Sequence, residues 1–144
     1  MPGTSDAAAR SMTLPAISHY MTAKPYTIDR LASLADAHRV MKEHDVRHLP
    51  VLDDGDLCGI VSERDLHMVE SLIGADPTST LVDTAMTDRP FIVTSDTLLD
   101  EVVEIMTDRK YGSVVVVGHG GVEGIFTTVD ACRALTQILR ERAV

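Results

Sequence analysis

Apolar residues follow two alternating spacings along the chain, and the same succession of spacings occurs twice. Each copy begins with a short extended run, followed by a stretch in which apolar side chains recur every three or four residues, as on one face of a helix. Two runs with the composition of strands come next, joined by DDGD or GHGG, which are glycine-containing turns of the hairpin type. A second helical stretch ends each copy. The predicted elements are 26–28, 31–41, 47–52, 57–61 and 63–73 in the first copy, and 91–93, 98–106, 113–117, 122–126 and 128–142 in the second.

Polar residues and glycine indicate where these elements begin and end. Asp29 and Ser95 precede the first helical stretch of each copy, where a short polar side chain can cap a helix. Gly74 follows the second helical stretch of the first copy and predicts its end. The chain is thereby divided into a flexible N-terminal tail (1–16), a first repeat (17–74), a linker (75–80) and a second repeat (81–144).

The two copies are also related residue by residue. At an offset of 65, residues 17–66 align with residues 82–131 without a gap, and ten pairs are identical where about three are expected by chance. Two copies are too few for a solenoid, so two similar halves related by a pseudo-twofold axis are expected. The identical pairs are Met21/Met86, Thr22/Thr87, Pro25/Pro90, Leu34/Leu99, Met41/Met106, Val51/Val116, Gly55/Gly120, Gly59/Gly124, Ile60/Ile125 and Asp65/Asp130.

Composition excludes several classes of protein. The chain of 144 residues is 44% hydrophobic and 24% charged, which is ordinary for a globular domain, but only 3% aromatic, so the core must be aliphatic. A formal charge of −9 disfavours nucleic acid and anionic membranes as partners. No apolar run approaches the ~20 residues of a membrane helix, and the first sixteen residues fit no secretory signal. A cytoplasmic protein is therefore expected.

No pattern of catalytic or metal-binding residues stands out. The two cysteines, Cys58 and Cys132, each lie in an apolar run and are expected to be reduced thiols. The sequence contains no P-loop, nucleophile elbow or pair of catalytic carboxylates, so an enzyme is not expected. Five histidines show no metal-ligand spacing and are assigned to surface or helix-face positions: His19, His38, His44, His67 and His119.

One motif recurs where the last predicted strand of each copy enters its second helix. It is Gly-Ile-Val-Ser-Glu-Arg-Asp at 59–65 and Gly-Ile-Phe-Thr-Thr-Val-Asp at 124–130. A hydroxyl followed three residues later by a carboxylate is close to a capping box, which satisfies backbone donors at a helix start. The same groups at a helix N-terminus can bind the vicinal hydroxyls of a sugar, and the glycine allows a planar ligand to approach the backbone. Spacing alone leaves both interpretations open.

The combination of these motifs resembles a tandem pair of cystathionine-β-synthase-type (CBS) domains, an arrangement called a Bateman module. The motifs that carry the resemblance are Met-Thr-x-x-Pro at 21–25 and 86–90, Arg-His-Leu-Pro-Val at 47–51, and the duplicated motif described above. The resemblance covers residues 17 to about 140. It implies an α+β fold of two repeats, each β-α-β-β-α, packed sheet to sheet. It also implies two clefts between the repeats for adenosyl ligands such as AMP, ADP, ATP or S-adenosylmethionine.

The resemblance also assigns roles to particular residues of this chain. Asp65 and Asp130 match ribose-binding carboxylates, and Ser62 and Thr127 match hydroxyls near the ribose and phosphate. The strand with His48 and Pro50 matches the part of the family's cleft that contacts adenine, whereas the second repeat lacks that proline. One wall of the cleft is matched by the segments that precede the first predicted strands, with Lys24 and Tyr26 in the first repeat and Arg89 and Phe91 in the second.

A phosphate-bearing ligand requires local cations because the net charge is unfavourable. Arg47, His48 and Arg64 lie within the motif segments of the first repeat, whereas Gly112, Ser113 and Val129 occupy the matching positions of the second. The two sites are therefore expected to be unequal, with a phosphate favouring a cleft that the cations of the first repeat reach.

These inferences predict a non-enzymatic regulatory module that binds an adenosyl ligand, requires no cofactor, and shifts its conformational populations on binding. The regulatory effect of ligand binding would be transmitted through an unknown effector protein or through a homodimer of four repeats. The predicted dimer face is the apolar side of the second helices: Leu66, Val69, Leu72, Ile73, Ala131, Leu135, Ile138 and Leu139. Three alternatives remain open, namely a dimerisation or scaffold module with empty clefts, a nucleotide hydrolase, and a nucleic-acid-binding protein.

Overall fold

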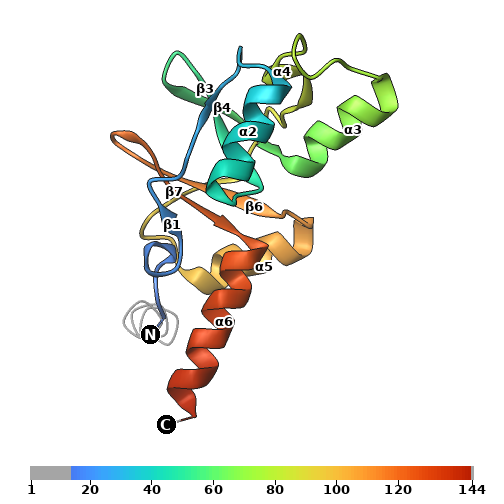
Figure 1. Ribbon diagram of the computed structural model, residues 1–144. Coiled ribbons are helices and arrows are strands. Elements are labelled where there is room, and N and C mark those ends of the chain that lie inside the picture. The colour runs from blue at the N-terminus through green and yellow to red at the C-terminus, as the bar shows by residue number, and fades with distance from the viewer. Residues whose placement is uncertain (1–13, 144) are drawn as a thin grey trace. The chain divides into compact units, whose positions relative to one another are not determined.

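A computed structural model describes residues 14–143, which form two compact units (Figure 1). The first-repeat unit contains residues 24–90 together with 119–122. The second-repeat unit contains the described residues up to 23, residues 91–118 and residues from 123 onward. Each unit has its own sheet and its own hydrophobic core.

The first-repeat unit is built on a three-stranded sheet of order β2-β3-β4. Strand β2 runs parallel to β3, and β3 and β4 form an antiparallel hairpin in which His48 lies opposite Ser62. Helices α2 and α3 lie side by side in this unit (Figure 1). The elements are β2 (Ile28–Asp29), α2 (Leu34–His44), β3 (His48–Asp53), β4 (Asp56–Ser62), α3 (Glu63–Ile73) and α4 (Val82–Ala85).

Aliphatic residues from all of these elements form the core of the first-repeat unit. Leu34 and Met41 project from α2, Leu49 and Val61 from the hairpin, and Leu66 from α3, and each is fully or almost fully buried. Full burial of an aliphatic side chain contributes about 1.5–3 kcal/mol. Leu66 is therefore a core residue, which corrects its predicted place on a dimer face.

The second-repeat unit has a four-stranded sheet of order β1-β7-β6-β5. Its core contains Phe126 with Val114, Val116 and Val102, and all four side chains are fully buried. The hairpin of β6 and β7 and the long α6 are prominent in Figure 1. The elements are the 3-10 helix η1 (Ile17–His19), β1 (Thr22–Ala23), β5 (Ile92–Thr94), α5 (Leu99–Arg109), β6 (Ser113–Gly118), β7 (Gly121–Thr127) and α6 (Thr128–Arg142).

The segment that leads into each repeat belongs to the unit formed by the other repeat. The Ile17 N–H donates to the Thr97 carbonyl at 2.8 Å, and the matching Val82 N–H donates to the Ala32 carbonyl at 2.8 Å. Ile17 and Val82 are both fully buried, each in the core of the unit that it joins. The compact units therefore exchange leading segments relative to the two repeats, because backbone pairing and core packing attach each leading segment to a distant part of the sequence.

Backbone hydrogen bonds also join the described end of the predicted tail and the predicted linker to the two units. The Pro15 carbonyl accepts from the Leu99 N–H at 2.9 Å, so the described end of the predicted tail is paired, whereas residues 1–13 lie outside the described residues. In the predicted linker, the Pro77 and Thr80 carbonyls accept from backbone N–H groups at the start of α2. The predicted linker is thus part of the first-repeat unit.

Two predicted helix caps are wrong. Ser33 caps α2, and Asp29 instead accepts a hydrogen bond from the Leu31 N–H at 2.8 Å in a turn before the helix. The N-cap of α5 is Leu98, whereas the Ser95 carbonyl accepts from the Ser18 N–H. The end of α3 agrees with expectation, because Gly74 has a φ of 70° at its C-cap.

The repeated glycines Gly59 and Gly124 are close to side chains of the leading segments. A Cβ at Gly59 would lie 2.6 Å from the Thr87 carbonyl oxygen and 2.7 Å from the Met86 sulfur. At Gly124, a Cβ would lie 2.4 Å from the Met21 sulfur. The expected space for a planar ligand at these glycines is therefore filled by the chain's own methionines, which corrects that interpretation.

Candidate functional site

Three helices of the structure begin with the capping-box pattern, in which a hydroxyl residue is followed three positions later by aspartate. These are α2 with Ser33 and Asp36, α3 with Ser62 and Asp65, and α6 with Thr127 and Asp130. One of them, at α2, lies outside the motifs that resemble a ligand site. It therefore shows what the pattern does when its role is structural.

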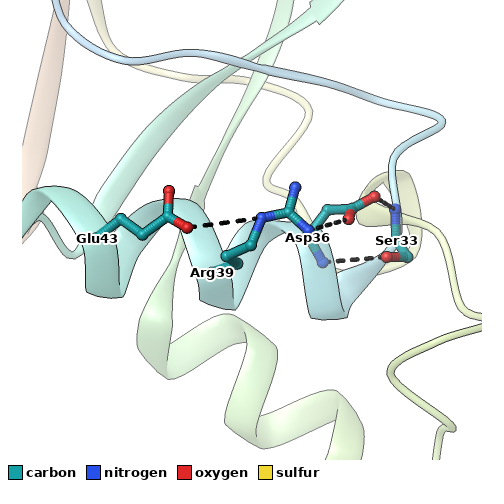
Figure 2. Close-up of polar contacts among 4 residues, drawn as sticks. All are labelled: Ser33, Asp36, Arg39 and Glu43. Atoms are coloured by element: carbon teal, nitrogen blue, oxygen red, sulfur yellow. Dashed lines mark hydrogen bonds and ion pairs between the residues drawn. The ribbon is translucent and has the colours of Figure 1, made fainter.

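In the α2 box both carboxylate oxygens of Asp36 are used (Figure 2). The Ser33 hydroxyl accepts from the Asp36 N–H at 3.0 Å, and Asp36 Oδ2 accepts from the Ser33 N–H at 3.4 Å. Asp36 Oδ1 accepts from Arg39 at 3.0 Å, and Arg39 also lies 3.9 Å from Glu43. The hydrogen bonds from the backbone and side chain of Ser33, followed by Arg39, hold the pKa of Asp36 below its ordinary value, while desolvation opposes them.

We expect the α2 capping box to lose strength in acid. Because the pKa of Asp36 is lowered in the folded state, its contribution is complete above the ordinary value of 3.8 and is lost as pH falls through the folded value. Asp36→Asn should therefore reduce the fall in the urea midpoint between about pH 4 and pH 2, followed by circular dichroism. Asp56→Asn, at an exposed hairpin carboxylate, is the control and should leave that fall unchanged; equal effects of both variants would contradict the assignment.

The α3 box leaves one oxygen of its carboxylate without a partner. Asp65 Oδ2 accepts from the Ser62 N–H at 2.9 Å, and the Ser62 hydroxyl accepts from the Asp65 N–H at 3.1 Å. Within residues 14–143, Asp65 Oδ1 accepts no hydrogen bond. The residue three positions after Asp65 is Met68, where the α2 and α6 boxes have arginine. The capping box therefore orients a half-buried carboxylate whose second oxygen remains available.

The α6 box uses both oxygens of its carboxylate. Asp130 is only 5% exposed, and its Oδ2 accepts from the Thr127 N–H at 2.9 Å and from the Thr127 hydroxyl at 3.3 Å. Its Oδ1 accepts from the Thr22 hydroxyl at 3.1 Å and from Arg133 at 3.0 Å. Asp65 and Asp130 are equivalent in sequence, yet among residues 14–143 Asp130 is hydrogen-bonded to Thr22, Thr127 and Arg133, whereas Asp65 is hydrogen-bonded only to Ser62.

Polar and cationic residues surround the start of α3. The Glu63 N–H donates to the Arg47 carbonyl at 2.9 Å, which brings the residue before β3 to the first turn of the helix. His48 pairs with Ser62 across the hairpin, and Arg64 is an exposed residue of the same first turn. The structure therefore brings Arg47, His48 and Arg64 to the start of α3, close to Asp65.

An aromatic pair lies at the same end of the sheet. Because β2 is parallel to β3, the chain just before β2 lies at the end of the sheet where β3 begins. Tyr26 precedes β2, is 51% exposed and stacks on His44 with ring centroids 3.6 Å apart. Lys24 is exposed near the start of this unit, and Pro50 is buried within β3 opposite Ile60. Arg89 is exposed near the end of the unit.

The start of α6 in the second-repeat unit has a different polar environment. The Thr128 N–H donates to the carbonyl of Gly112, the residue that matches Arg47. Phe91 precedes β5 and contacts Tyr111 with ring centroids 5.4 Å apart. Arg133 is the cation at this helix start, and it is already paired with Asp130.

The structure also places together three residues that were not expected to form a group. His38 of α2 lies beside His67 and Glu70 of α3, with one potential ligand atom of each within 4.8 Å of the others. The sequence does carry a signal, because His67 and Glu70 are three residues apart and so share a helix face. The third member was not predictable because it comes from another helix.

Both cysteines are free thiols. Cys132 is exposed on α6, and Cys58 is half-buried in β4. Burial, followed by the charge of Asp53, raises the pKa of the Cys58 thiol and so disfavours its reactive thiolate form. Among residues 14–143, no helix has the length and apolar character needed to cross a bilayer.

Comparison with known proteins identifies the family. The model of the CBS domain matches residues 17–71 and again residues 77–137, and the chain therefore belongs to the CBS-domain family as a tandem CBS pair. The uncharacterised protein YlbB of Bacillus subtilis is 33% identical over 129 residues, which cover 88% of this chain and 85% of that protein. The α+β fold of two CBS repeats is thereby confirmed.

Two solved structures are similar over most of their length. A putative acetoin utilization protein, AcuB, from Vibrio cholerae has a TM-score of 0.77 and 29% identity, and the match covers 90% of this chain and 96% of that one. CBSX2 of Arabidopsis thaliana, in complex with AMP, has a TM-score of 0.75 and 28% identity, with coverage of 86% and 98%.

Proposed function

We propose that this protein is a regulatory module that binds an adenosyl ligand at the start of α3 in the first-repeat unit. The observation that carries the proposal is the available Oδ1 of Asp65, which the Ser62 capping box holds at a helix N-terminus. A carboxylate accepts hydrogen bonds strongly, so the two vicinal hydroxyls of a ribose are suitable donors. The crystallised chain of CBSX2, 98% of which is covered by the match to this chain, is in complex with AMP.

Charge at the same place suits a ligand that carries phosphate. Arg64 lies in the first turn of α3 and the Arg47 carbonyl accepts from the Glu63 N–H, at the helix end whose positive dipole potential also favours an anion. Tyr26 offers an exposed aromatic ring at that end of the sheet. These residues are the proposed partners of the ribose, phosphate and base of one nucleotide, and the proposed role is binding with no chemical step.

The matching position in the second-repeat unit is proposed to be the weaker one. Asp130 already accepts from Thr22, Thr127 and Arg133, so a ligand would have to displace one of these partners. The two halves are thus proposed to bind the same ligand with different affinities, the higher affinity being at Asp65.

Ligand binding is proposed to select among conformations of the module and to act on a partner protein or on a second copy of this chain. Exposed apolar residues on α3 and α6 support a homodimer: Leu72 and Ile73, and Leu135 and Leu139. Sedimentation at the mass of one chain at micromolar concentration would exclude that dimer. The two unpaired cysteines support a reducing compartment such as the cytoplasm.

The binding proposal is tested by calorimetric titration with AMP, ADP, ATP and S-adenosylmethionine. Asp65→Ala should weaken the tightest of these ligands at least about tenfold, because charged hydrogen bonds to ribose contribute roughly 1.5–3 kcal/mol each. Asp36→Ala is a matched control, since it removes the same capping residue from another helix of the same unit and should leave the affinity unchanged. Met68→Arg should also weaken binding, because an arginine three residues after Asp65 can occupy Oδ1 as Arg39 occupies that of Asp36.

Two results would contradict the proposal. Equal loss of affinity in Asp65→Ala and Asp36→Ala would show that helix stability, and not recognition, is involved. Binding of none of the four ligands at millimolar concentration would favour the alternative of a dimerisation or scaffold module without a ligand, in which all three capping boxes are structural.

A further inference from the structure

The strongest unassigned group of side chains lies between α2 and α3. Two imidazoles and one carboxylate meet there: His38 from α2, and His67 and Glu70 from α3. His38 Nε2 lies 2.8 Å from Glu70 Oε1, and the rings of His38 and His67 are stacked with centroids 5.3 Å apart. Within residues 14–143, no other three histidine, cysteine, aspartate or glutamate side chains have potential ligand atoms within 4.8 Å of one another.

We propose that His38, His67 and Glu70 form a binding site for a divalent transition-metal ion, with zinc the best fit. Neutral imidazole and carboxylate are ordinary zinc ligands, and a set of two histidines and one glutamate leaves a fourth tetrahedral position for water or another ligand. Mg²⁺ and Ca²⁺ prefer oxygen ligands, so this mixed set disfavours them. The formal charge of −9 also favours a cation over an anion.

The distances fit such an ion with small side-chain movements. With zinc–ligand distances of about 2.0–2.2 Å, neighbouring ligand atoms in a tetrahedral site lie about 3.3–3.6 Å apart. The three atoms here lie within 4.8 Å of one another, and the pair at 2.8 Å has to open by only a fraction of an ångström. Because His67 is exposed, its ring can rotate toward the other two residues without displacing the core.

Both helices that carry the ligand residues are packed into the hydrophobic core of the first-repeat unit. His38 follows Leu34 by one helical turn, and Glu70 follows Leu66 by one turn; Leu34 and Leu66 are both fully buried in the core of the first-repeat unit. The donors are therefore supplied by packed helices and not by loops, so little order has to be gained when the ion binds. Neither Ser62 nor Asp65 belongs to the group, so it is separate from the proposed nucleotide site.

The test is calorimetric titration of the tag-free full chain, stripped of metal by a chelator, with ZnCl₂ and with MgCl₂. We expect one Zn²⁺ per chain at micromolar or lower Kd, and no binding of Mg²⁺ at millimolar concentration. His67→Gln and Glu70→Gln should each weaken Zn²⁺ binding at least tenfold, whereas His119→Gln, at an exposed hairpin turn, should leave it unchanged. Co²⁺ in place of Zn²⁺ should give the visible absorption of a tetrahedral site, and His67→Gln should abolish it.

Three outcomes would overturn the metal site. The first is no binding of Zn²⁺ below millimolar concentration, which would leave His38 and Glu70 as an ordinary hydrogen-bonded pair. The second is equal affinity in the parent chain and in His67→Gln, and the third is equal weakening by His119→Gln. Since His67 is exposed, its replacement should leave the circular-dichroism spectrum unchanged, so loss of Zn²⁺ binding cannot be attributed to unfolding.

Discussion

Replacing Asp130 by alanine is expected to destabilise the second-repeat unit by about 3 kcal/mol, because the variant loses several charged hydrogen bonds at once. The carboxylate is 5% exposed and accepts from Thr22, Thr127 and Arg133. Removal of the carboxylate leaves the Thr127 N–H at the start of α6 without its acceptor. The variant also loses the hydrogen bond from Thr22 that joins β1 to α6. Hydrogen exchange measured by mass spectrometry should therefore show faster exchange in α6 and β7.

Asp65→Ala is the matched comparison for this prediction. Asp65 has the same position in its repeat but, within the part of the chain that the structure describes, accepts only from Ser62, so its replacement should cost about 1 kcal/mol, the ordinary cost of a lost cap. Asp130→Asn should fall between the two alanine variants because an amide oxygen can still accept from the backbone. Equal destabilisation by Asp65→Ala and Asp130→Ala would show that the contacts to Thr22 and Arg133 contribute nothing.

Gly59→Ala is expected to destabilise the first-repeat unit by about 1–3 kcal/mol through overpacking. The added methyl group would lie 2.6 Å from the carbonyl oxygen of Thr87, which accepts from the Ile60 N–H, while the Thr87 N–H donates to the Ile60 carbonyl. Relief of this clash requires the Thr87 segment to move away and its two hydrogen bonds to lengthen. The urea midpoint and the exchange of the Thr87 and Ile60 amides measure the effect.

Gly124→Ala provides the control in the other repeat. There the three nearest atoms all belong to the side chain of Met21, which has rotatable bonds and can adapt. Its cost should therefore be below about 1 kcal/mol. Neither Gly59 nor Gly124 has a positive φ, so strain from the left-handed region does not enter the comparison. A cost at Gly124 that equals the cost at Gly59 would refute the distinction between backbone and side-chain neighbours.

The sequence predicts α3 and α6 well because their signals are local, whereas α2 begins and ends three residues later than the expected 31–41. Helices α3 and α6 have the bounds expected from their apolar spacing, with the hydroxyl residue before each start and Gly74 after the end of α3. The single-turn helices η1 and α4 were not predicted, because three or four residues are too few to show a helical period. The exchange of leading segments was not predictable either, because the pairing of Ile17 with Thr97 leaves no local signal.

The candidate site is predictable in its residues but not in its asymmetry. The repeat identifies Asp65 and Asp130 as a pair, whereas the bond from Thr22 to Asp130 joins residues 108 apart in sequence. Part of the difference could have been read directly, since Arg39 and Arg133 each follow a capping aspartate by three residues and Met68 does not. Local helix geometry makes that spacing meaningful, because residues three apart are neighbours on a helix.

The exchange of leading segments bears on how such a chain arises by gene duplication. Val82 completes the core made mostly of residues from the first repeat, and Ile17 completes the core made mostly of residues from the second. An ancestor that encoded one copy would have lacked a core residue unless it borrowed that segment from another molecule. Fusion of two genes places both repeats in one chain. Each repeat then receives its core residue from the same molecule, so that completion of the core no longer depends on protein concentration.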